Sequence, residues 1–282
     1  MIVWLSSYPK SGNTYLRALI SAYIFTNDGE FNFNLLKNFI QFPNYYIFEQ
    51  LKINKNNQSE ILKNYSKAQE FISKLGNQNS IQFVKTHSGC MQLKNQKFLD
   101  FKTTLGAIYI VRDPRNVVTS YAKHYQKSNE EASFDLISDL TLGVNSKTHP
   151  PTYVGTWGSN YQSWKRLETT ERYLLIRYED MLADPEKILL KVLNFIYNLS
   201  KSKFLIDKIK LKNVLYSTKF EKMEKLEKEI GFHEANINKA DGKKIKFFNL
   251  GKNNNWKNIL KDNLVNKIEN SFKKEMIELN YL

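Results

Sequence analysis

A polar loop between a short apolar run and an amphipathic segment restricts the fold more than any other feature of the sequence. The apolar residues 2–5 lead through Tyr8-Pro9-Lys10-Ser11-Gly12 into residues 14–25, where apolar side chains recur three and four apart. This order is typical of a buried strand, a tight turn and a helix. Gly12 lets the backbone approach an oxyanion closely, and the N–H groups at the start of a helix attract anions. The segment therefore predicts a phosphate-binding loop.

The loop is not the Gly-x-x-x-x-Gly-Lys-Ser/Thr motif of nucleoside triphosphatases. Lys10 precedes Gly12 instead of following it, and no second glycine frames the turn. Lys-Ser-Gly alone would also fit an ordinary strand–turn–helix connection. A strand, a turn that contains a lysine, and a helix follow one another directly here, and this order favours phosphate binding.

The rest of the chain alternates strands and helices. Apolar runs at residues 81–84, 107–111 and 173–176 predict three more buried parallel strands. Helical spacing is found over residues 61–75, 114–125 and 185–197, the last two beginning with Asp-Pro. These patterns predict an α/β fold with a central parallel sheet and helices on both faces. The 282 residues suit one domain, 1–282.

Composition limits the setting and the partners. A net charge of +14 favours anionic partners, which include nucleic acid, membranes and a nucleotide with several anionic groups. Cys90 is the single cysteine, which excludes an internal disulfide and a multi-cysteine metal site and fits a cytoplasmic location. No apolar run approaches the roughly 20 residues that a membrane span needs. We therefore expect no transmembrane segment or signal peptide.

A second anion site is indicated at the end of the run 107–111. Arg112 follows it directly, and Ser120 lies about two helical turns further on, on the same face of the predicted helix. A guanidinium binds an oxyanion through two parallel hydrogen bonds. An ion pair of Arg112 with Asp113 or with another surface carboxylate is the alternative explanation.

A histidine follows another predicted strand. His87 comes directly after Phe83-Val84-Lys85-Thr86 and is the one histidine of four in such a position. Its ordinary pKa of about 6.5 would leave it largely neutral at pH 7, as a general base requires. Lys85 would add positive charge nearby. A capping or solvent-facing histidine is the alternative.

Together these segments resemble the motifs of sulfotransferases that use 3′-phosphoadenosine 5′-phosphosulfate (PAPS). The loop Tyr8–Tyr15 resembles the donor's 5′-phosphosulfate loop, with Asn13 and Tyr15 where the family usually has Thr and Trp. The pair Arg112 and Ser120 resembles the 3′-phosphate motif. Lys85-Thr86-His87 resembles the acceptor-activating segment.

The later motifs resemble the family in part. Tyr178-Glu179-Asp180-Met181 resembles a segment beside the 3′-phosphate, and Ser217–Met223 resembles the adenine-contacting stretch with Thr218 and Phe220 retained. Where the family usually has Arg-Lys-Gly, this chain has Asn249-Leu250-Gly251. We expect the Gly251 backbone and the Lys252 charge to take over contacts there.

The resemblance implies a cytosolic-type, bacterial-like sulfotransferase with a three-layer sandwich like that of P-loop nucleotide kinases. It implies in-line transfer from PAPS to a hydroxyl or amine of a small-molecule or glycan acceptor, which leaves PAP and needs no metal. His87 would be the base, aided by Lys10 and Lys85. The implied donor-binding residues are Lys10, Ser11, Gly12, Asn13, Thr14, Tyr15, Arg112, Ser120, Tyr178, Thr218, Phe220, Gly251 and Lys252.

Several questions stay open at this point. An ATP-dependent small-molecule kinase of related fold and a basic nucleic-acid-binding protein are the alternative functions. The acceptor is undetermined; its pocket would come from loops 31–48, 91–98, 142–153 and 231–248. Residues 231–255 have little apolar periodicity, which is typical of a lid or of a disordered segment. The oligomeric state is open, and a dimer is compatible with the sequence.

Overall fold

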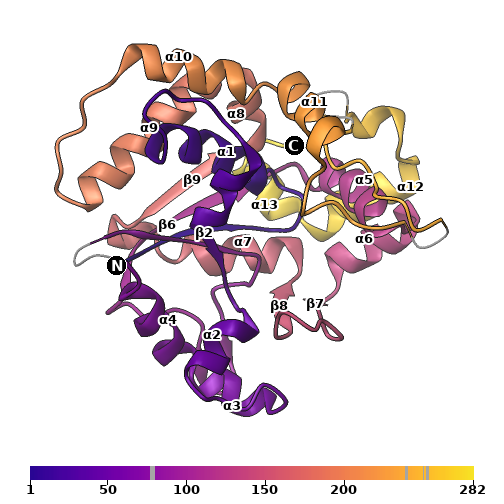
Figure 1. The fold of residues 1–282 in the computed structure, drawn as a ribbon. Coiled ribbons are helices and arrows are strands. Elements are labelled where there is room, and N and C mark those ends of the chain that lie inside the picture. The colour runs from indigo at the N-terminus through magenta and orange to yellow at the C-terminus, as the bar shows by residue number, and fades with distance from the viewer. Residues whose placement is uncertain (77–79, 239–240, 250, 252–253) are drawn as a thin grey trace.

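Five parallel strands form the centre of the computed structural model, which describes residues 1–76, 80–238, 241–249, 251 and 254–282. The strand order is β2-β3-β1-β6-β9, so the first long strand lies in the middle (Figure 1). The strands are β1 (Ile2–Ser7), β2 (Phe39–Gln41), β3 (Gln82–Thr86), β6 (Thr104–Val111) and β9 (Tyr173–Arg177). Two small antiparallel pairs lie outside this sheet, β4 (Gln92–Leu93) with β5 (Gln96–Lys97) and β7 (Leu140–Leu142) with β8 (Thr152–Gly155).

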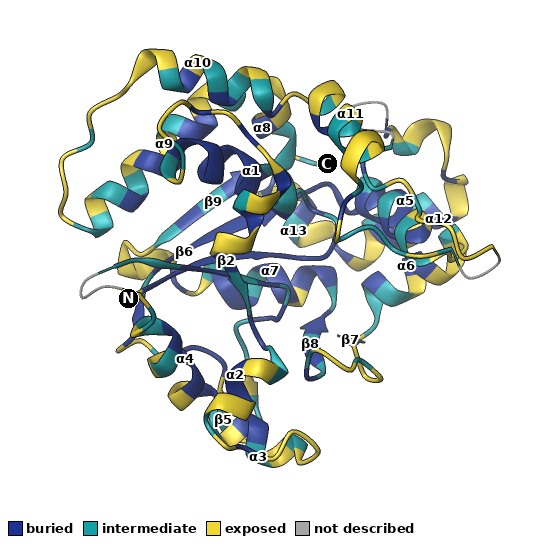
Figure 2. Cartoon of the chain, in the orientation of Figure 1, coloured by how far each residue is buried: buried dark blue, intermediate teal, exposed yellow. Residues whose placement is uncertain are grey.

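Side chains of β1 alternate between two hydrophobic cores, as the two-residue period of a strand dictates. Ile2 and Trp4 belong to one core, and Val3 and Leu5 belong to the other. Both sets are fully buried, and Figure 2 shows the sheet buried between helices whose outer faces are exposed. The predicted parallel sheet with helices on both faces is confirmed.

The helices divide between the two cores. Val3 and Leu5 pack with α1 (Asn13–Ile24), η1 (Phe33–Asn38), α9 (Pro185–Leu199), α10 (Lys208–Ser217), and single residues of α8 (Tyr178–Ala183) and α11 (Phe220–Ile230). Ile2 and Trp4 pack with α2 (Tyr45–Gln50), α3 (Gln58–Lys63), α4 (Tyr65–Ser73), α5 (Pro114–Tyr125), α6 (Asn129–Ile137), α7 (Trp157–Lys165), α12 (Asp262–Ser271) and α13 (Lys273–Glu278). The described residues also contain the short 3₁₀ turns η2 (Glu168–Thr170) and η4 (Trp256–Asn258).

Most predicted elements are present, with two differences. The helical pattern over residues 61–75 is two helices, α3 and α4, because the chain breaks at Asn64, which ends one helix and begins the other. The edge strand β2 was not predicted, since three residues are too few to show a period. It pairs with β3 inside the segment 31–48 that was expected to be an acceptor loop.

The parallel pairing brings the carboxyl ends of four strands to one edge. Ser6 of β1 is in register with Thr86 of β3 and with Tyr109 of β6, and Val111 is in register with Arg177 of β9. Ligands of open parallel sheets bind at this edge. The loop after β1, His87, Arg112 and Tyr178 all follow these strand ends.

The described part of the expected lid is irregular but docked on the core. Phe232 and Phe248 are buried, and their rings lie 5.5 Å apart in a cluster with Phe33 and Phe247. The Glu227 carboxylate accepts hydrogen bonds from the backbone N–H groups of Phe247 and Phe248. Aromatic packing therefore replaces regular structure here.

Within the described residues no helix is both long and apolar enough to cross a bilayer.

Candidate active site

A cavity of about 1090 Å³ opens at the carboxyl edge of the sheet. Its walls come from the loop after β1, the ends of β3 and β6, helix α5 and the segment after α11. All four histidines of the chain line it, at positions 87, 124, 149 and 233. Its charged lining residues, as far as the structure describes them, are Lys10, Arg17, Lys37, Lys85, Arg112, Lys123, Lys219, Lys246, Glu221 and Glu234. The excess of cations suits an anionic ligand.

The loop after β1 turns tightly to reach the start of α1. Lys10 and Gly12 have positive φ angles of 65° and 100°. A Cβ on Gly12 would lie 2.3 Å from a ring carbon of Tyr178, so both the conformation and the space require glycine. The Ser11 hydroxyl is buried and, among the described residues, has no hydrogen-bond partner. A buried, unpaired donor beside a helix N-terminus fits an anion.

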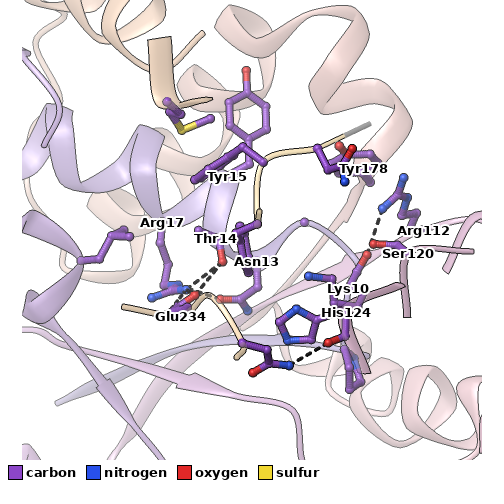
Figure 3. A pocket seen from close by; sticks show the side chains of 18 of the residues that line it. Lys10, Asn13, Thr14, Tyr15, Arg17, Arg112, Ser120, His124, Tyr178 and Glu234 are labelled. Carbon is purple, nitrogen blue, oxygen red and sulfur yellow. Dashed lines mark hydrogen bonds and ion pairs between the residues drawn. The ribbon is translucent and has the colours of Figure 1, made fainter. Parts of the chain in front are cut away.

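The next two side chains point away from that role. Asn13 Nδ2 donates to the Leu5 carbonyl at 3.1 Å, and Asn13 Oδ1 accepts from Arg17 Nε at 3.0 Å. Thr14 Oγ1 donates to Glu234 Oε2 at 2.9 Å (Figure 3). Both side chains thus hold the loop in place, and what these residues can offer a ligand is their backbone N–H groups.

Two half-buried lysines of the cavity, Lys10 and Lys85, have lowered pKa values. Burial, together with the charge of Arg112, lowers the pKa of Lys10 to about 7. The Lys10 ammonium lies 4.2 Å above the Phe247 ring. Burial also lowers the pKa of Lys85, and Glu234 acts in the opposite direction. An anion placed beside these groups would raise both pKa values.

His87 is held by the end of β1. Its Nδ1 lies 2.8 Å from the Ser7 carbonyl oxygen, which can only accept a hydrogen bond. The proton therefore sits on Nδ1, and Nε2 keeps its lone pair. Burial and the charge of Lys85 lower the pKa of His87 to about 3, so the ring is neutral at pH 7.

Arg112 does not form an ion pair with Asp113, which was an alternative explanation for an arginine at this position. Asp113 instead pairs with Arg115 at 2.8 Å and caps α5 by accepting from the Arg115 N–H. Arg112 Nη1 donates to the Lys10 carbonyl at 3.1 Å, and its guanidinium stacks 4.3 Å from the Tyr178 ring. Its Nε is buried and, within the described residues, has no partner. Ser120 lines the same cavity beside it (Figure 3).

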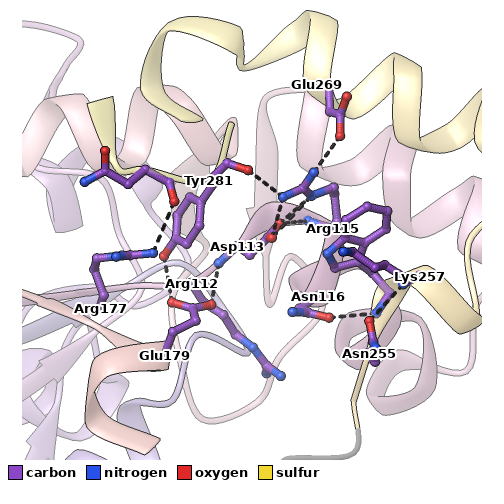
Figure 4. Close-up of polar contacts among 12 residues, drawn as sticks. Arg112, Asp113, Arg115, Asn116, Arg177, Glu179, Asn255, Lys257, Glu269 and Tyr281 are labelled. Atoms are coloured by element: carbon purple, nitrogen blue, oxygen red, sulfur yellow. Dashed lines mark hydrogen bonds and ion pairs between the residues drawn. The ribbon is translucent and has the colours of Figure 1, made fainter. Parts of the chain in front are cut away.

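Contacts around the carboxylate of Glu179 fix the backbone at Arg112. Glu179 Oε1 accepts from the Asp113 N–H at 3.0 Å, and Oε2 accepts from the Tyr281 hydroxyl at 2.8 Å (Figure 4). Arg115 Nη2 donates to the Tyr281 carbonyl at 2.8 Å. Two neighbouring residues of this motif thus have different roles. Tyr178 lines the cavity, and Glu179 holds the backbone that follows Arg112.

The residues predicted to contact the adenine, and Gly251, predicted to contact the 3′-phosphate, differ in position. Tyr15, Phe220 and Gly251 line the cavity, and Gly251 packs so closely on the Phe220 ring that a Cβ would lie 2.8 Å from it. Thr218 is fully buried and is not among the lining residues; its hydroxyl donates to the Val214 carbonyl at 2.7 Å. The predicted contact at Lys252 lies outside the described residues, as does Leu250, where the chain departs from the family pattern.

Arg17, His124 and Glu234 are among the polar lining residues that were not predicted as site residues. Arg17 lies one helical turn after Thr14, and His124 lies one turn after Ser120, so helical spacing could have indicated both. Figure 3 shows His124 beside Lys10, and burial lowers the pKa of His124 to about 3. Glu234 pairs with Arg17 across more than two hundred residues, and no local pattern indicates that contact. The described residues contain no group of three His, Cys, Asp or Glu side chains arranged for a metal ion.

The sequence matches known proteins over nearly its whole length. The family model of the sulfotransferase domain matches residues 2–280. The chain is similar to flavonol 3-sulfotransferase of Flaveria bidentis, with 26% identity over 275 residues that cover 95% of this chain and 79% of the relative. It is also similar to sulfotransferase 1 family member D1 of Mus musculus, with 26% identity over 209 residues, 73% of this chain and 65% of the relative.

Two solved structures share the fold. Mouse sulfotransferase SULT7A1 complexed with PAP matches with a TM-score of 0.60 and 17% identity, over 97% of this chain and 83% of that one. A retinol dehydratase in a complex with retinol and PAP matches with a TM-score of 0.60 and 18% identity, over 98% and 81%. At these identities the likeness concerns the arrangement of strands and helices.

Proposed function

We propose, on the premise that the chain belongs to the sulfotransferase family and is a PAPS-dependent sulfotransferase, which acceptor it uses. In this proposal the enzyme transfers the sulfuryl group, inside the cavity, to a hydroxyl or amine of a small-molecule or glycan acceptor. One observation carries the proposal. Two groups of anion donors, one on the loop after β1 and one at Arg112 and Ser120, share a cavity with the neutral His87. The whole chain, residues 1–282, would act as one sulfotransferase domain.

The unpaired donors suit the two ends of a 3′-phosphorylated nucleotide. We assign the 5′-phosphate to the Lys10 ammonium and the backbone N–H groups from Gly12 to Thr14, which come from residues that line the cavity. We add the unpaired hydroxyl of Ser11, which is fully buried next to them and is not itself among the lining residues. We assign the 3′-phosphate to Arg112 and Ser120, beside Tyr178. The rings of Tyr15 and Phe220 would border the adenine.

PAPS supplies a sulfuryl group whose bond to the bridging phosphate oxygen breaks as a bond to the acceptor oxygen or nitrogen forms. His87 Nε2 takes the acceptor's proton in that step. Lys10 and Lys85 compensate the negative charge that develops on the phosphate and the transferring group. The donor's negative charge also raises the pKa of His87 from its value in the free protein, which makes it a better base.

The likeness to a flavonol sulfotransferase supports a small-molecule acceptor. Phe39, Tyr125, Leu142 and Phe247 give apolar surface to the cavity that His87 also lines. Aromatic side chains of this kind suit an acceptor with a flat apolar body. A cytoplasmic setting stays a prediction.

Ligand preference tests the proposal against the ATP-dependent kinase. PAP at about 100 times its Kd should stabilise the protein by about 2.7 kcal/mol, and ATP with Mg²⁺ should stabilise it less. Thermal unfolding measures both. Greater stabilisation by ATP with Mg²⁺ would favour the kinase, and tight binding of RNA that PAP does not displace would favour a nucleic-acid-binding protein.

Replacing Arg112 makes the same test residue-specific. Arg112→Met should abolish the preference for PAP over adenosine 5′-phosphate, since only PAP has the 3′-phosphate assigned to this guanidinium. Arg166→Met is the matched control because Arg166 is exposed and does not line the cavity. An Arg112→Met variant that keeps the preference would contradict the assignment.

A further inference from the structure

The carboxylate of Glu234 lies between the phosphate loop and the end of β3. Arg17 Nη2 donates to Glu234 Oε1 at 2.7 Å and to Oε2 at 2.8 Å, and Thr14 Oγ1 donates to Oε2 at 2.9 Å. Lys85 Nζ lies 3.7 Å from Oε1. Figure 3 shows Arg17, Thr14 and Glu234 converging in the cavity. One side chain of the C-terminal third thus contacts three residues of the N-terminal third.

A carboxylate at the position of Glu234 should weaken the binding of an anion in this cavity. Only two carboxylates are found among the described lining residues, Glu221 and Glu234, and Glu234 contacts the loop assigned to the 5′-phosphate. A negative charge there repels a negatively charged donor. Another effect must offset that repulsion, and the contacts of Glu234 indicate which one.

Arg17 and Lys85 are the charges that Glu234 compensates. The Arg17 side chain is 2% exposed, and the ion pairs of the described residues give it this carboxylate as its counter-ion. Lys85 is 12% exposed and faces the same carboxylate. Buried cations without a counter-ion are strongly destabilised and lose protons or move toward water.

We propose that Glu234 is a positioning residue for sulfuryl transfer, which holds Arg17 in place and keeps the Lys85 ammonium charged and directed at the reacting group. The inference rests on the proposed function, because Lys85 was assigned to that group there. It goes beyond that function by giving the segment after α11 a direct part in preparing the site.

The charge balance at Lys85 has contributions from every wall of the cavity. The charged and titratable groups that act on Lys85, or on which it acts, are Lys10, Arg17, His87, His124, His149, His233 and Glu234. All four histidines have lowered pKa values and are neutral above pH 7, so Glu234 is the one anion in this set. Removing its charge lowers the pKa of Lys85 further.

The test compares Glu234→Gln with Glu229→Gln. Glutamine keeps the shape of the side chain and removes its charge, and Glu229 is an exposed residue of α11 that pairs only with Lys225 among the described ion pairs. Acetic anhydride acetylates neutral amines, so mass spectrometry of Lys85 acetylation against pH reports its protonation. In Glu234→Gln the midpoint should move to lower pH by about one unit, as expected for a lost neighbouring charge. Glu229→Gln should match the wild type.

Donor turnover and PAP affinity complete the experiment. With 2-naphthol or water as acceptor, Glu234→Gln should release PAP from PAPS about tenfold more slowly than the wild type. Its Kd for PAP should stay equal or fall, because a charge that repels the nucleotide has been removed. An unchanged Lys85 profile, or turnover equal to that of Glu229→Gln, would overturn the inference. Unchanged Lys85 acetylation with much tighter PAP binding would instead mark Glu234 as a competitor of the donor.

A double variant controls for the chance that Glu234→Gln lowers turnover only because it destabilises the fold. Glu234→Gln leaves Arg17 buried and unpaired, whereas Arg17→Met/Glu234→Gln removes both charges. Recovery of turnover in the double variant would mean that Glu234 serves Arg17 alone and would overturn the role toward Lys85. A wild type that neither binds PAP nor turns over PAPS would refute the proposed function, while the acetylation profile would still decide whether Glu234 acts on Lys85.

Discussion

Burial sets the protonation of the individual residues in this cavity. Lys10 has a pKa of about 7, and His87 and His124 each have a pKa of about 3, with burial as the largest cause in all three. A sequence motif identifies such residues without giving their charge. The surrounding side chains and strand ends decide that charge, because they exclude water.

His87→Ala should lower turnover by about 10² to 10⁴-fold, the usual contribution of a general base, and should change the Kd for PAP little. Turnover is measured with the acceptor found by a labelled-donor screen, and the Kd by calorimetry. His124→Ala is the informative comparison, since His124 is also neutral and lines the same cavity. Loss of turnover in His124→Ala with wild-type turnover in His87→Ala would transfer the role of base to His124.

At the scale of elements, the ends of β1, β3, β6 and β9 build the site, and more distant segments support it. The loop at Arg112 depends on Glu179 of α8 and on Tyr281 after α13, both of which contact it through hydrogen bonds. Trp157 at the start of α7 donates to the Arg112 carbonyl at 3.2 Å. Residues far along the chain thus fix the direction of one guanidinium.

Tyr281→Phe should therefore weaken PAP binding several-fold without replacing any residue that contacts the ligand. The variant leaves one Glu179 oxygen without its partner, which should lower the free energy of unfolding by about 1–3 kcal/mol. Calorimetry and urea unfolding measure the two effects. Tyr216→Phe is the control, as Tyr216 is 53% exposed. Equal PAP affinity in the two variants would show that the loop assigned to the 3′-phosphate does not need Tyr281.

For the whole molecule, stability should fall as the pH is lowered below about 6.5, the ordinary histidine pKa. In the unfolded chain histidines take up protons there, whereas His87 and His124 stay neutral in the folded chain until about pH 3. Each such histidine lowers the free energy of unfolding by about 1.4 kcal/mol per pH unit. Glu234, whose pKa lies below its ordinary value because Lys85 and Arg17 outweigh its burial, adds to the loss below about pH 4.5.

Urea unfolding at pH 7.5 and pH 5.5 measures this dependence. The unfolding free energy should be lower at pH 5.5, and His87→Gln should reduce the difference between the two values. Equal stability at both pH values would mean that these histidines are protonated in the folded state.

The order of apolar runs, polar strand ends and amphipathic segments was enough to predict the parallel sheet, the loop from Lys10 to Tyr15 and the position of Arg112 with Ser120. Those features depend on short-range periodicity and on the rule that parallel strands end at one edge. Thr218 shows where motif resemblance stops: its side chain is buried and bonded within its own helix. Strand β2 was missed because it is too short to show a period.

By itself, the sequence determined that a tight polar loop joins a central strand to a helix, because each part lies within a few residues of the next. Only the tertiary structure decided how charge is balanced around that loop. The contact of Glu234 with Arg17 and Lys85 joins residues far apart in the chain, and the low pKa values of the histidines come from the exclusion of water by all walls together. Neither effect has a local signature, since both depend on which distant segments pack side by side.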